Sequence, residues 1–443
     1  MLDFFAREIR SFLRSERRKA QLDAARYLAG RHDILNRART VIGRDGLLEE
    51  SRNLPNNRLV DNQFGKLVRQ KVNYLAGNPF TVNPPELAAF FTLRRRKTVR
   101  SALEDAVACG TGWLAPGVDA SGNPTLRRLP PYEVLPFWAD SDHTVLDCAI
   151  RVFDAERFLP GFPGAPGRRR TVTRAELYTP QGVSRFVLDG ERLVPDDCLP
   201  SGPWLTVNEK KFGFGATPLV AFKSPGEQPL LERVKTLQDA LNTLISDYQN
   251  ALQEDARNTI LVLKNYDGGD LAEFRRNLAA YGAVKVRTVD NSQGGVETLR
   301  VDTSHEGFLA MANLLKGAIV ENGMGFDVRD GTLRGAPNQM TLLALYSDIE
   351  LDAHGLESEW QASFCDLLSF VRSIMLATGK SVPPDAETGV SFNRDLLLNE
   401  SSIMRTLLDA GLKLSNESLL EQVPWVRDAK SEQERLKKEE AFA

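Results

Sequence analysis

Apolar residues recur every three or four positions over several long stretches of the chain, which is the pattern of amphipathic helices. The stretch from Leu93 gives one such helix, which ends at Gly110. Residues 57–77 give an earlier one, with Gly77 and Pro79 as a stop signal. Its apolar positions are Val60, Phe64, Leu67, Val68, Val72 and Leu75.

Between about 111 and 228 the apolar pattern changes to short runs separated by turn residues. Asp-Gly and Gly-Asn-Pro punctuate stretches such as "GVDASGNPTLRRL" and "AELYTPQGVSRFVLDGERLV". This alternation is typical of hairpins. We therefore expect a mainly β region that forms, with the preceding helices, a first unit over residues 1–228.

A heptad-like seam then predicts a long helix over residues 229–257. Apolar side chains alternate in steps of four and three, and such a seam requires another helix alongside, from the same chain or from a neighbouring one. The seam residues are Leu230, Val234, Leu237, Leu241, Leu244 and Tyr248.

Residues 258–303 show a β-α-β-β pattern, a small α/β insert that we expect to be stabilised by packing against copies of itself. Helical patterns return at 304–322 and, for roughly forty residues, from 338. The unit 338–394 contains this long helix and the segment after it, and 395–443 is a charged, mainly helical C-terminal part. The expected fold class is α+β, mainly helical.

The glycine-rich stretch "ENGMGFDVRDGTLRGAPN", residues 321–338, connects two of these helices. A phosphate-binding loop needs a strand before it, so that backbone N–H groups point at the phosphate. No strand precedes this loop. We interpret residues 323–337 as an elbow between two helices.

The net charge and the length of the apolar runs argue against two kinds of partner, nucleic acid that is gripped tightly and a membrane that is spanned. The chain has 56 basic and 59 acidic residues and a net charge of −3, which does not suit a protein whose main task is to grip nucleic-acid phosphates. No apolar run approaches the ~18 residues of a membrane span. Leu2, Phe5, Ile9 and Phe12 form an apolar stripe that we expect to pack on the protein itself rather than on a membrane.

Enzyme chemistry finds little support in the sequence. The four cysteines (Cys109, Cys148, Cys198 and Cys365) have no metal-ligand spacing and suggest reduced, buried thiols. "ATGKS", residues 377–381, resembles the end of a P-loop, but Ile374 stands where the first glycine is needed and a helix precedes it. Gly379 is better explained as the residue that ends this helix. We expect no catalytic residue, no metal and no cofactor.

Four segments, taken in order, resemble the portal proteins of tailed bacteriophages, specifically the type common in phages of Gram-positive bacteria. They are "NRLVDNQFGKLVRQKVNYLAGNPFTV", "ALEDAVACGTGWLAPGVDASGNPTLRRLPPYEVLPFW", "GFGATPLVAFKSPGEQPLLERVKTLQDALNTLISDYQNALQ" and "LLEQVPWVRDAKSEQERL". None of these segments carries chemistry, and the similarity rests on the ordered set.

The resemblance implies a ring of identical subunits, usually twelve, at one vertex of the capsid. A large terminase would drive double-stranded DNA through its channel. Major capsid and scaffolding proteins and a head-completion adaptor would be further partners, and no membrane is implied. Residues 1–228 and the long helix would form the wing, 229–257 and 304–322 the stem, 258–303 the clip and 395–443 the crown.

The resemblance also implies site residues. Residues 323–337 would be the tunnel loop, with DNA-facing candidates Lys316, Gly323, Gly325, Arg329, Gly331, Arg334, Gly335 and Asn338. Terminase-docking candidates in the clip are Asp267, Arg275, Arg276 and Lys285. Arg329 and Arg334 either contact phosphates or pair with Asp327, Asp330 or a neighbouring subunit. Two alternatives stay open: a nucleic-acid enzyme such as a packaging ATPase or nuclease, and a helical scaffold unrelated to phages.

Overall fold

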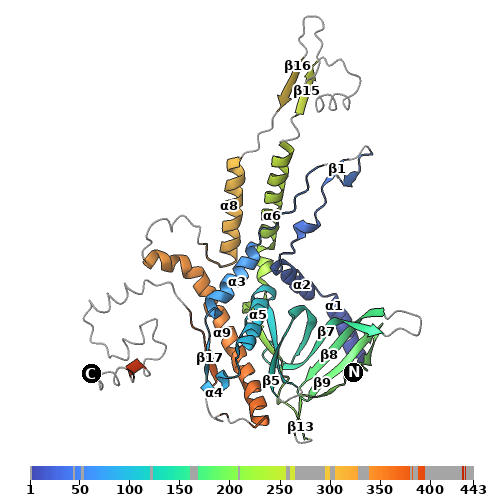
Figure 1. The fold of residues 1–443 in the computed structure, drawn as a ribbon, viewed down its shortest axis with the longest axis vertical. Helices are drawn as coiled ribbons and strands as arrows, with labels where there is room; N and C mark the ends of the chain where they lie inside the picture. The colour runs from blue at the N-terminus through green and yellow to red at the C-terminus, as the bar shows by residue number, and fades with distance from the viewer. Residues whose placement is uncertain are drawn as a thin grey trace.

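A broad body carries a projecting stem of two long helices, and a hairpin arm extends beside the stem (Figure 1). The computed structural model describes residues 2–42, 45–50, 54–119, 123–159, 168–207, 210–255, 260–264, 295–299, 305–327, 339–379, 382, 388–394, 432–433 and 435. Within these residues the architecture is α+β.

Long helices form the frame of the molecule and account for most of its regular structure. The α-helices are α1 (Leu2–Leu13), α2 (Glu16–Leu28), α3 (Gln63–Ala76), α4 (Pro85–Ala88), α5 (Leu93–Cys109), α6 (Leu230–Asp255), α8 (His305–Asn322) and α9 (Gln339–Ala377). Short 3-10 turns are η1 (Asp33–Asn36), η2 (Pro131–Glu133) and η3 (Pro225–Glu227).

The β region expected at 111–228 is confirmed as antiparallel sheets. One sheet has the order β10-β9-β8-β7-β6, with β11 beside β9, and a second has the order β14-β4-β5. Their strands are β4 (Thr111–Val118), β5 (Pro124–Leu129), β6 (Val134–Trp138), β7 (Leu146–Leu159), β8 (Arg168–Thr179), β9 (Gly182–Asp189), β10 (Arg192–Pro195), β11 (Gly202–Pro203) and β14 (Val220–Lys223).

Smaller pairs complete the strands. They are β1 (Thr40–Ile42) with β2 (Leu48–Glu50), β12 (Leu205–Val207) with β13 (Lys210–Phe212), β15 (Ile260–Lys264) with β16 (Gly295–Leu299), and β3 (Thr81–Asn83) with β17 (Gly389–Ser391). The β15–β16 pair lies at the far end of the stem (Figure 1). The predicted helix and first hairpin strand of the insert lie outside the described residues.

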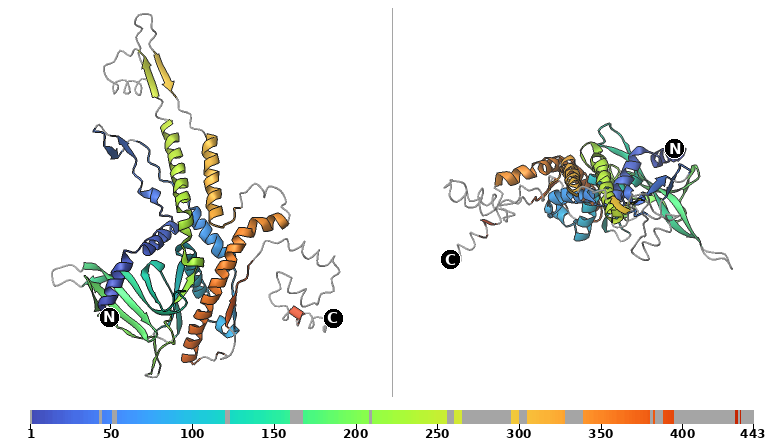
Figure 2. Two further views of the ribbon diagram at one scale, coloured as in Figure 1. Left: turned by 180° about the vertical axis from the view of Figure 1, so that it is seen from behind. Right: turned by 90° about the horizontal axis from the view of Figure 1, so that it is seen from above.

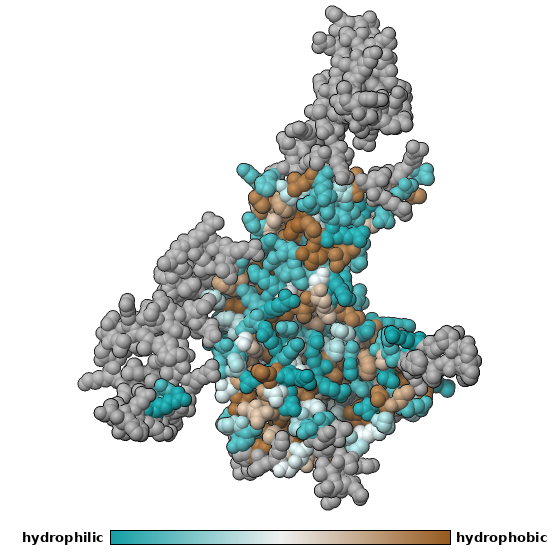
Figure 3. Space-filling model, in the orientation of Figure 1, coloured by the Kyte–Doolittle hydropathy of each residue, from teal (hydrophilic) through white to brown (hydrophobic). Residues whose placement is uncertain are grey.

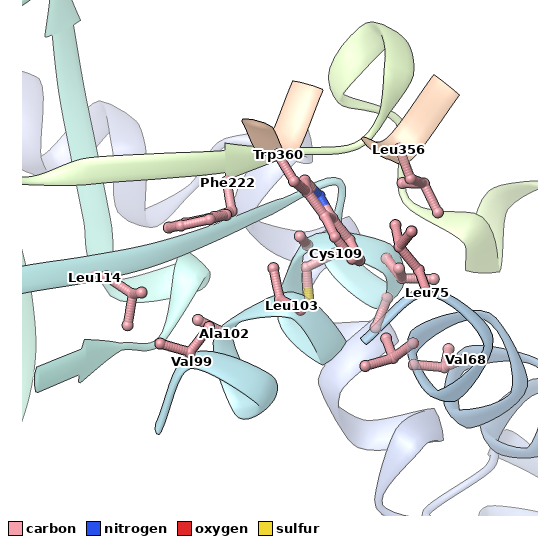
Figure 4. Packing of buried hydrophobic residues seen from close by; sticks show 14 of the residues in the cluster. Val68, Leu75, Val99, Ala102, Leu103, Cys109, Leu114, Phe222, Leu356 and Trp360 are labelled. Atoms are coloured by element: carbon pink, nitrogen blue, oxygen red, sulfur yellow. The ribbon is translucent and has the colours of Figure 1, made fainter. Parts of the chain in front are cut away.

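The main core joins α3, α5, α9 and the β14-β4-β5 sheet (Figure 4). Trp360 of α9 is fully buried there, and its indole Nε1 donates a hydrogen bond to the Lys223 carbonyl at 3.0 Å. α5 ends at Gly110, whose φ of 83° is in the left-handed region that glycine adopts without strain. The helix end expected at this position is confirmed.

Helix α1 packs on the larger sheet, which confirms that its apolar stripe contacts the protein itself at Phe5, Ile9 and Phe12, although Leu2 is exposed. Ile9 is fully buried in a cluster with residues of β7, β8 and β10, and Phe5 packs against Phe137 of β6 at a ring distance of 5.8 Å. No helix in the described part of the chain is both long and apolar enough to cross a membrane.

The helix predicted over residues 57–77 begins later than the pattern indicated. α3 starts at Gln63, after the cap Asn62, and residues 55–62 are not helical. Val60 and its neighbours have helical spacing, so the prediction was wrong over the first turn and a half. The reason is tertiary: the backbone of this segment is hydrogen-bonded by side chains of α6, as described next.

Candidate functional site

The stem consists of α6 and α8, which lie side by side in two opposite views (Figures 1 and 2). Among the seam residues, Leu230, Val234 and Leu241 are buried in the main core. Leu237 and Leu244 are partly buried against that core. The α6 seam therefore packs largely within its own chain.

The far end of the stem is held by aromatic contacts. The Tyr248 ring of α6 stacks on Phe308 of α8 at 3.8 Å, and its hydroxyl lies 2.6 Å from Nδ1 of His305. Tyr248 thus joins α6 to α8 at this end of the stem.

A ladder of polar side chains runs along another face of α6, and the sequence analysis missed it. Its members, Gln238, Asn242, Ser246 and Asn250, are all buried. Their oxygens accept the backbone N–H groups of Phe64, Asp61, Leu59 and Asn57 in turn, at 3.0, 3.0, 3.0 and 2.8 Å.

This ladder works because two repeat lengths nearly match. Four residues of α-helix rise about 6 Å, and two residues of extended chain rise about 6.6–6.8 Å. Side chains four apart on α6 therefore meet alternate amides of residues 57–61, which run in the opposite direction. α6 thus supplies acceptors to amides of a non-helical segment, and α3 starts only after that segment, at Gln63, with Asn62 as its cap. The sequence shows polar residues at i, i+4, i+8 and i+12 on α6 but not that they are buried.

Charged groups fix the base of the stem to α2. Nζ of Lys235 lies 2.6 Å from Asp33 and 3.0 Å from Asp239, and the Tyr27 hydroxyl donates to Asp239 at 2.6 Å. Burial opposes the charge of Lys235, but its hydrogen bonds to Asp33, Tyr27 and Asp239 outweigh burial and raise its pKa. α6 is thus held by ionic contacts as well as by the ladder.

His32 lies between these two systems. Asn242 Nδ2 donates to His32 Nδ1 at 2.9 Å, and the opposite ring nitrogen lies 3.2 Å from the Tyr27 carbonyl. This pattern requires the neutral ring with its proton on Nε2. Burial lowers the pKa of His32, in agreement with a neutral side chain.

The chain leaving α8 is clamped to α3 and α9. Gln70 donates to the Phe326 carbonyl at 2.7 Å and accepts its N–H at 3.1 Å. Lys71, almost fully buried, donates to the Met324 carbonyl at 3.1 Å and pairs with Asp352 of α9 at 2.6 Å. The ring of Phe326 stacks on Tyr346 at 4.2 Å. The first residues of the predicted tunnel loop are therefore fixed to the body.

Gly323 and Gly325 lie in this clamped part. A Cβ on Gly325 would stand 2.3 Å from Cδ2 of Leu67, and one on Gly323 would stand 2.6 Å from Cδ1 of the same leucine. Neither glycine has a positive φ. Their shared role in the structure is close approach to α3.

The other predicted site residues are placed as follows. Lys316 pairs with Asp61 at 2.8 Å, so its charge is compensated within the chain. The remaining tunnel-loop candidates lie outside the described residues: Arg329, Gly331, Arg334, Gly335 and Asn338. The clip candidates Asp267, Arg275, Arg276 and Lys285 also lie outside them.

No group of three or more His, Cys, Asp or Glu side chains in the described part of the chain is arranged to hold a metal ion. Gly379, with a φ of 79°, follows the end of α9, as predicted.

The cysteine prediction was partly wrong: Cys109 is buried, but Cys198 and Cys365 are exposed, since they lie in a turn and on the outer face of α9. None forms a disulfide.

Comparison with known proteins identifies the class as that of phage portal proteins. A family model described as "Phage portal protein, SPP1 Gp6-like" matches residues 14–443, and the chain therefore belongs to the SPP1 Gp6-like family. The alternative of a scaffold unrelated to phages is thereby overturned.

Two relatives are named portal proteins. The one from Bacillus phage SPP1 is 25% identical over 433 residues, covering 94% of this chain and 83% of that protein. The one from Clostridium phage phiCD119 is 26% identical over 442 residues, covering 96% and 93%. A solved HK97 family phage portal protein from Corynebacterium diphtheriae has a TM-score of 0.33 and 11% identity, covering 80% of this chain and 98% of that one.

Proposed function

We propose that this chain forms a closed ring of identical subunits, twelve in the virion, at one vertex of a phage capsid. Double-stranded DNA passes through its channel, driven by a large terminase during packaging and released later toward the tail. The observation that carries this proposal is the family match over residues 14–443. The role is structural, without catalysis.

The charge of the chain is compatible with a conduit. Each phosphate that a protein neutralises releases counterions and adds affinity, which would slow a sliding duplex. The net charge is −3, and Lys316 of the stem is already paired with Asp61. Both features are compatible with a channel that binds DNA weakly.

Electron microscopy of negatively stained protein, with native mass spectrometry of the same sample, tests the ring. Rings with a central hole and twelve or thirteen subunits support the proposal, since a recombinant ring can differ by one from the virion count. A monomer or dimer at every salt concentration would contradict it.

The tunnel-loop assignment has a separate test. Gly331→Val with Gly335→Val should leave rings intact but lower DNA packaging, because β-branched residues restrict backbone movement. Normal packaging would contradict a moving loop around these two glycines.

We also assign the clip, residues 258–303, to docking of terminase and later of the head-completion adaptor. Arg275→Glu with Arg276→Glu should weaken terminase binding while rings still form. Unchanged binding would remove these two residues from the docking surface. Contacts of residues 1–228 and of α9 with major capsid and scaffolding proteins complete the proposed set of partners.

A further inference from the structure

Two apolar surfaces near the stem lack a partner in the single chain. On α8, Leu309, Met311 and Leu314 are 45%, 49% and 63% exposed. On the arm, Leu47 and Leu48 are 70% and 72% exposed. The described stem accordingly shows brown, hydrophobic areas in Figure 3. Met311 and Leu314, three residues apart, share one face of α8, whereas Leu309 lies about 140–160° around the helix from them. Exposed apolar surface of this kind marks a site of interaction.

The arm, described at residues 37–42, 45–50 and 54–56, is joined to the body at its base. Arg37 pairs with Asp247 of α6 at 2.8 Å, and Arg39 donates to the Pro55 carbonyl at 2.7 Å. Beyond this base, β1 and β2 pair over three residues each, from Thr40 opposite Glu50 to Ile42 opposite Leu48. Residues 45–50 are all exposed. A two-stranded hairpin of this length is at best marginally stable alone.

The α8 surface does not suit DNA. Lys316 is the only lysine or arginine in α8, and it is paired with Asp61. The exposed polar positions of the helix include the acidic residues Glu306 and Glu321. An apolar protein segment fits this surface better than a phosphate backbone.

The two surfaces lie on opposite sides of the stem. In Figure 1 and in the view from behind in Figure 2, the arm extends along the α6 side, and α8 is on the other side. The strands of the arm reach the level of the N-terminal end of α8 (Figure 1). Rotation about an axis parallel to the stem preserves this level, so one copy presents its arm to the α8 of the next.

We propose that the arm of each copy packs Leu47 and Leu48 against the exposed face of α8 in the adjacent copy. The contact is head to tail, so each copy donates one arm and accepts one, as a closing ring requires. This inference rests on the proposed ring and adds the surface that joins its members at the stem.

Cross-linking with a short bis-maleimide tests the contact. Leu48→Cys and Leu314→Cys are placed together in a background with Cys198→Ser and Cys365→Ser, which removes the exposed native thiols. Each thiol adds to one maleimide, forming two thioethers without an oxidant. We expect a ladder of covalent multimers on a denaturing gel. The matched control joins Leu48→Cys to Leu93→Cys, an 88% exposed site on α5, and should give no ladder.

Mixing the two single-cysteine proteins sharpens the result. A mixture of Leu48→Cys and Leu314→Cys proteins should give dimers and nothing larger, because each molecule then has one reactive site. Cross-linked monomer from the double variant, without multimers, would place the arm on its own α8 and overturn the proposal. Rings by microscopy without cross-links above the control would overturn the arm contact but leave the ring standing. If neither rings nor cross-links above the control are found, both the ring and the arm contact are overturned.

A second variant measures the contribution of the arm. Leu47→Ser with Leu48→Ser should raise the concentration needed for half-assembly by at least about tenfold, which corresponds to about 1.4 kcal/mol. Leu93→Ser should leave it unchanged. Circular dichroism should match the parent for both variants, because all three leucines are exposed in the single chain. Unchanged assembly of the arm variant would contradict the proposal.

Discussion

The polar-ladder face of α6 and the exposed face of α8 differ in how their surfaces are satisfied. On α6, every rung of the ladder meets a backbone amide, and Lys235 and Asp239 are paired. On α8, Leu314 is mostly exposed, as is Leu48 on the arm. The α6 face is completed by its own chain, whereas the α8 face is the one that we propose to meet another copy. The residues expected to govern fold stability therefore differ from those proposed to govern assembly.

The largest difference in the free energy of unfolding is expected between alanine substitutions at two leucines of the stem. Leu241→Ala, at a fully buried position, should reduce the free energy of unfolding by about 2–5 kcal/mol because it leaves a cavity. Leu314→Ala, at a position 63% exposed, should change it by less than about 0.5 kcal/mol. Urea unfolding of the monomeric protein measures both. Equal losses would mean that α8 is already covered in the single chain.

The next largest loss of stability is expected at Lys71, because this residue of α3 contacts both the segment after α8 and helix α9. Lys71→Met leaves Asp352 without its partner and should cost about 3 kcal/mol, the lower end for a broken buried pair, because Asp352 is partly exposed. Lys71→Met with Asp352→Leu should recover much of the loss. Hydrogen exchange of the Met324–Phe326 amides reports the local effect. Lys66→Met on the exposed face of α3 is the control, and an equal loss there would contradict a specific role for the pair.

A single rung of the ladder should have a smaller effect. Asn242→Ala removes the acceptor of the half-buried Asp61 N–H and should cost about 1–3 kcal/mol. Thr243→Ala, next in sequence but exposed, should be nearly neutral. Urea unfolding separates the two. A neutral Asn242→Ala would show that water replaces the side chain and that the ladder does not hold the segment.

The smallest expected effect is a pH dependence at His32. Its pKa is lowered by burial, so the folded state binds the proton less well than the unfolded state. Stability is therefore full above the ordinary histidine pKa of about 6.5 and falls as the pH drops through it. Protonation of Nδ1 would set a donor against the Asn242 amide. His32→Gln should flatten the unfolding profile between pH 7.5 and 5.5. An unchanged slope would assign the pH dependence to other groups.

Periodicity in the sequence predicted the long elements well. α6, α8 and α9 begin and end within a few residues of their predicted limits, because each has a sustained apolar stripe and a clear stop such as Gly379. The start of α3 was mispredicted, because the competing hydrogen bonds come from α6, far away in the sequence. Local patterns do not report such a partner. The pairing of Lys316 with Asp61 was missed for the same reason.

The site was predictable only as far as the family resemblance extended. Nothing in the glycine spacing indicates that Gly323 and Gly325 serve to approach Leu67, since a turn glycine and a packing glycine look alike in sequence. Spacing alone could not single out the polar ladder, because Lys235, Asp239, Thr243 and Asp247 recur at the same four-residue interval on α6.

The ladder also fixes the angle at which the stem stands about its own long axis. Successive residues of a helix turn by about 100°, so a small twist of α6 would misalign all four rungs together. In a closed circle of identical parts, the angular error of one part is repeated by every other and accumulates around the circumference. The hydrogen bonds from α6 to the amides of residues 57–64 would thus limit this angular error in each subunit before assembly begins.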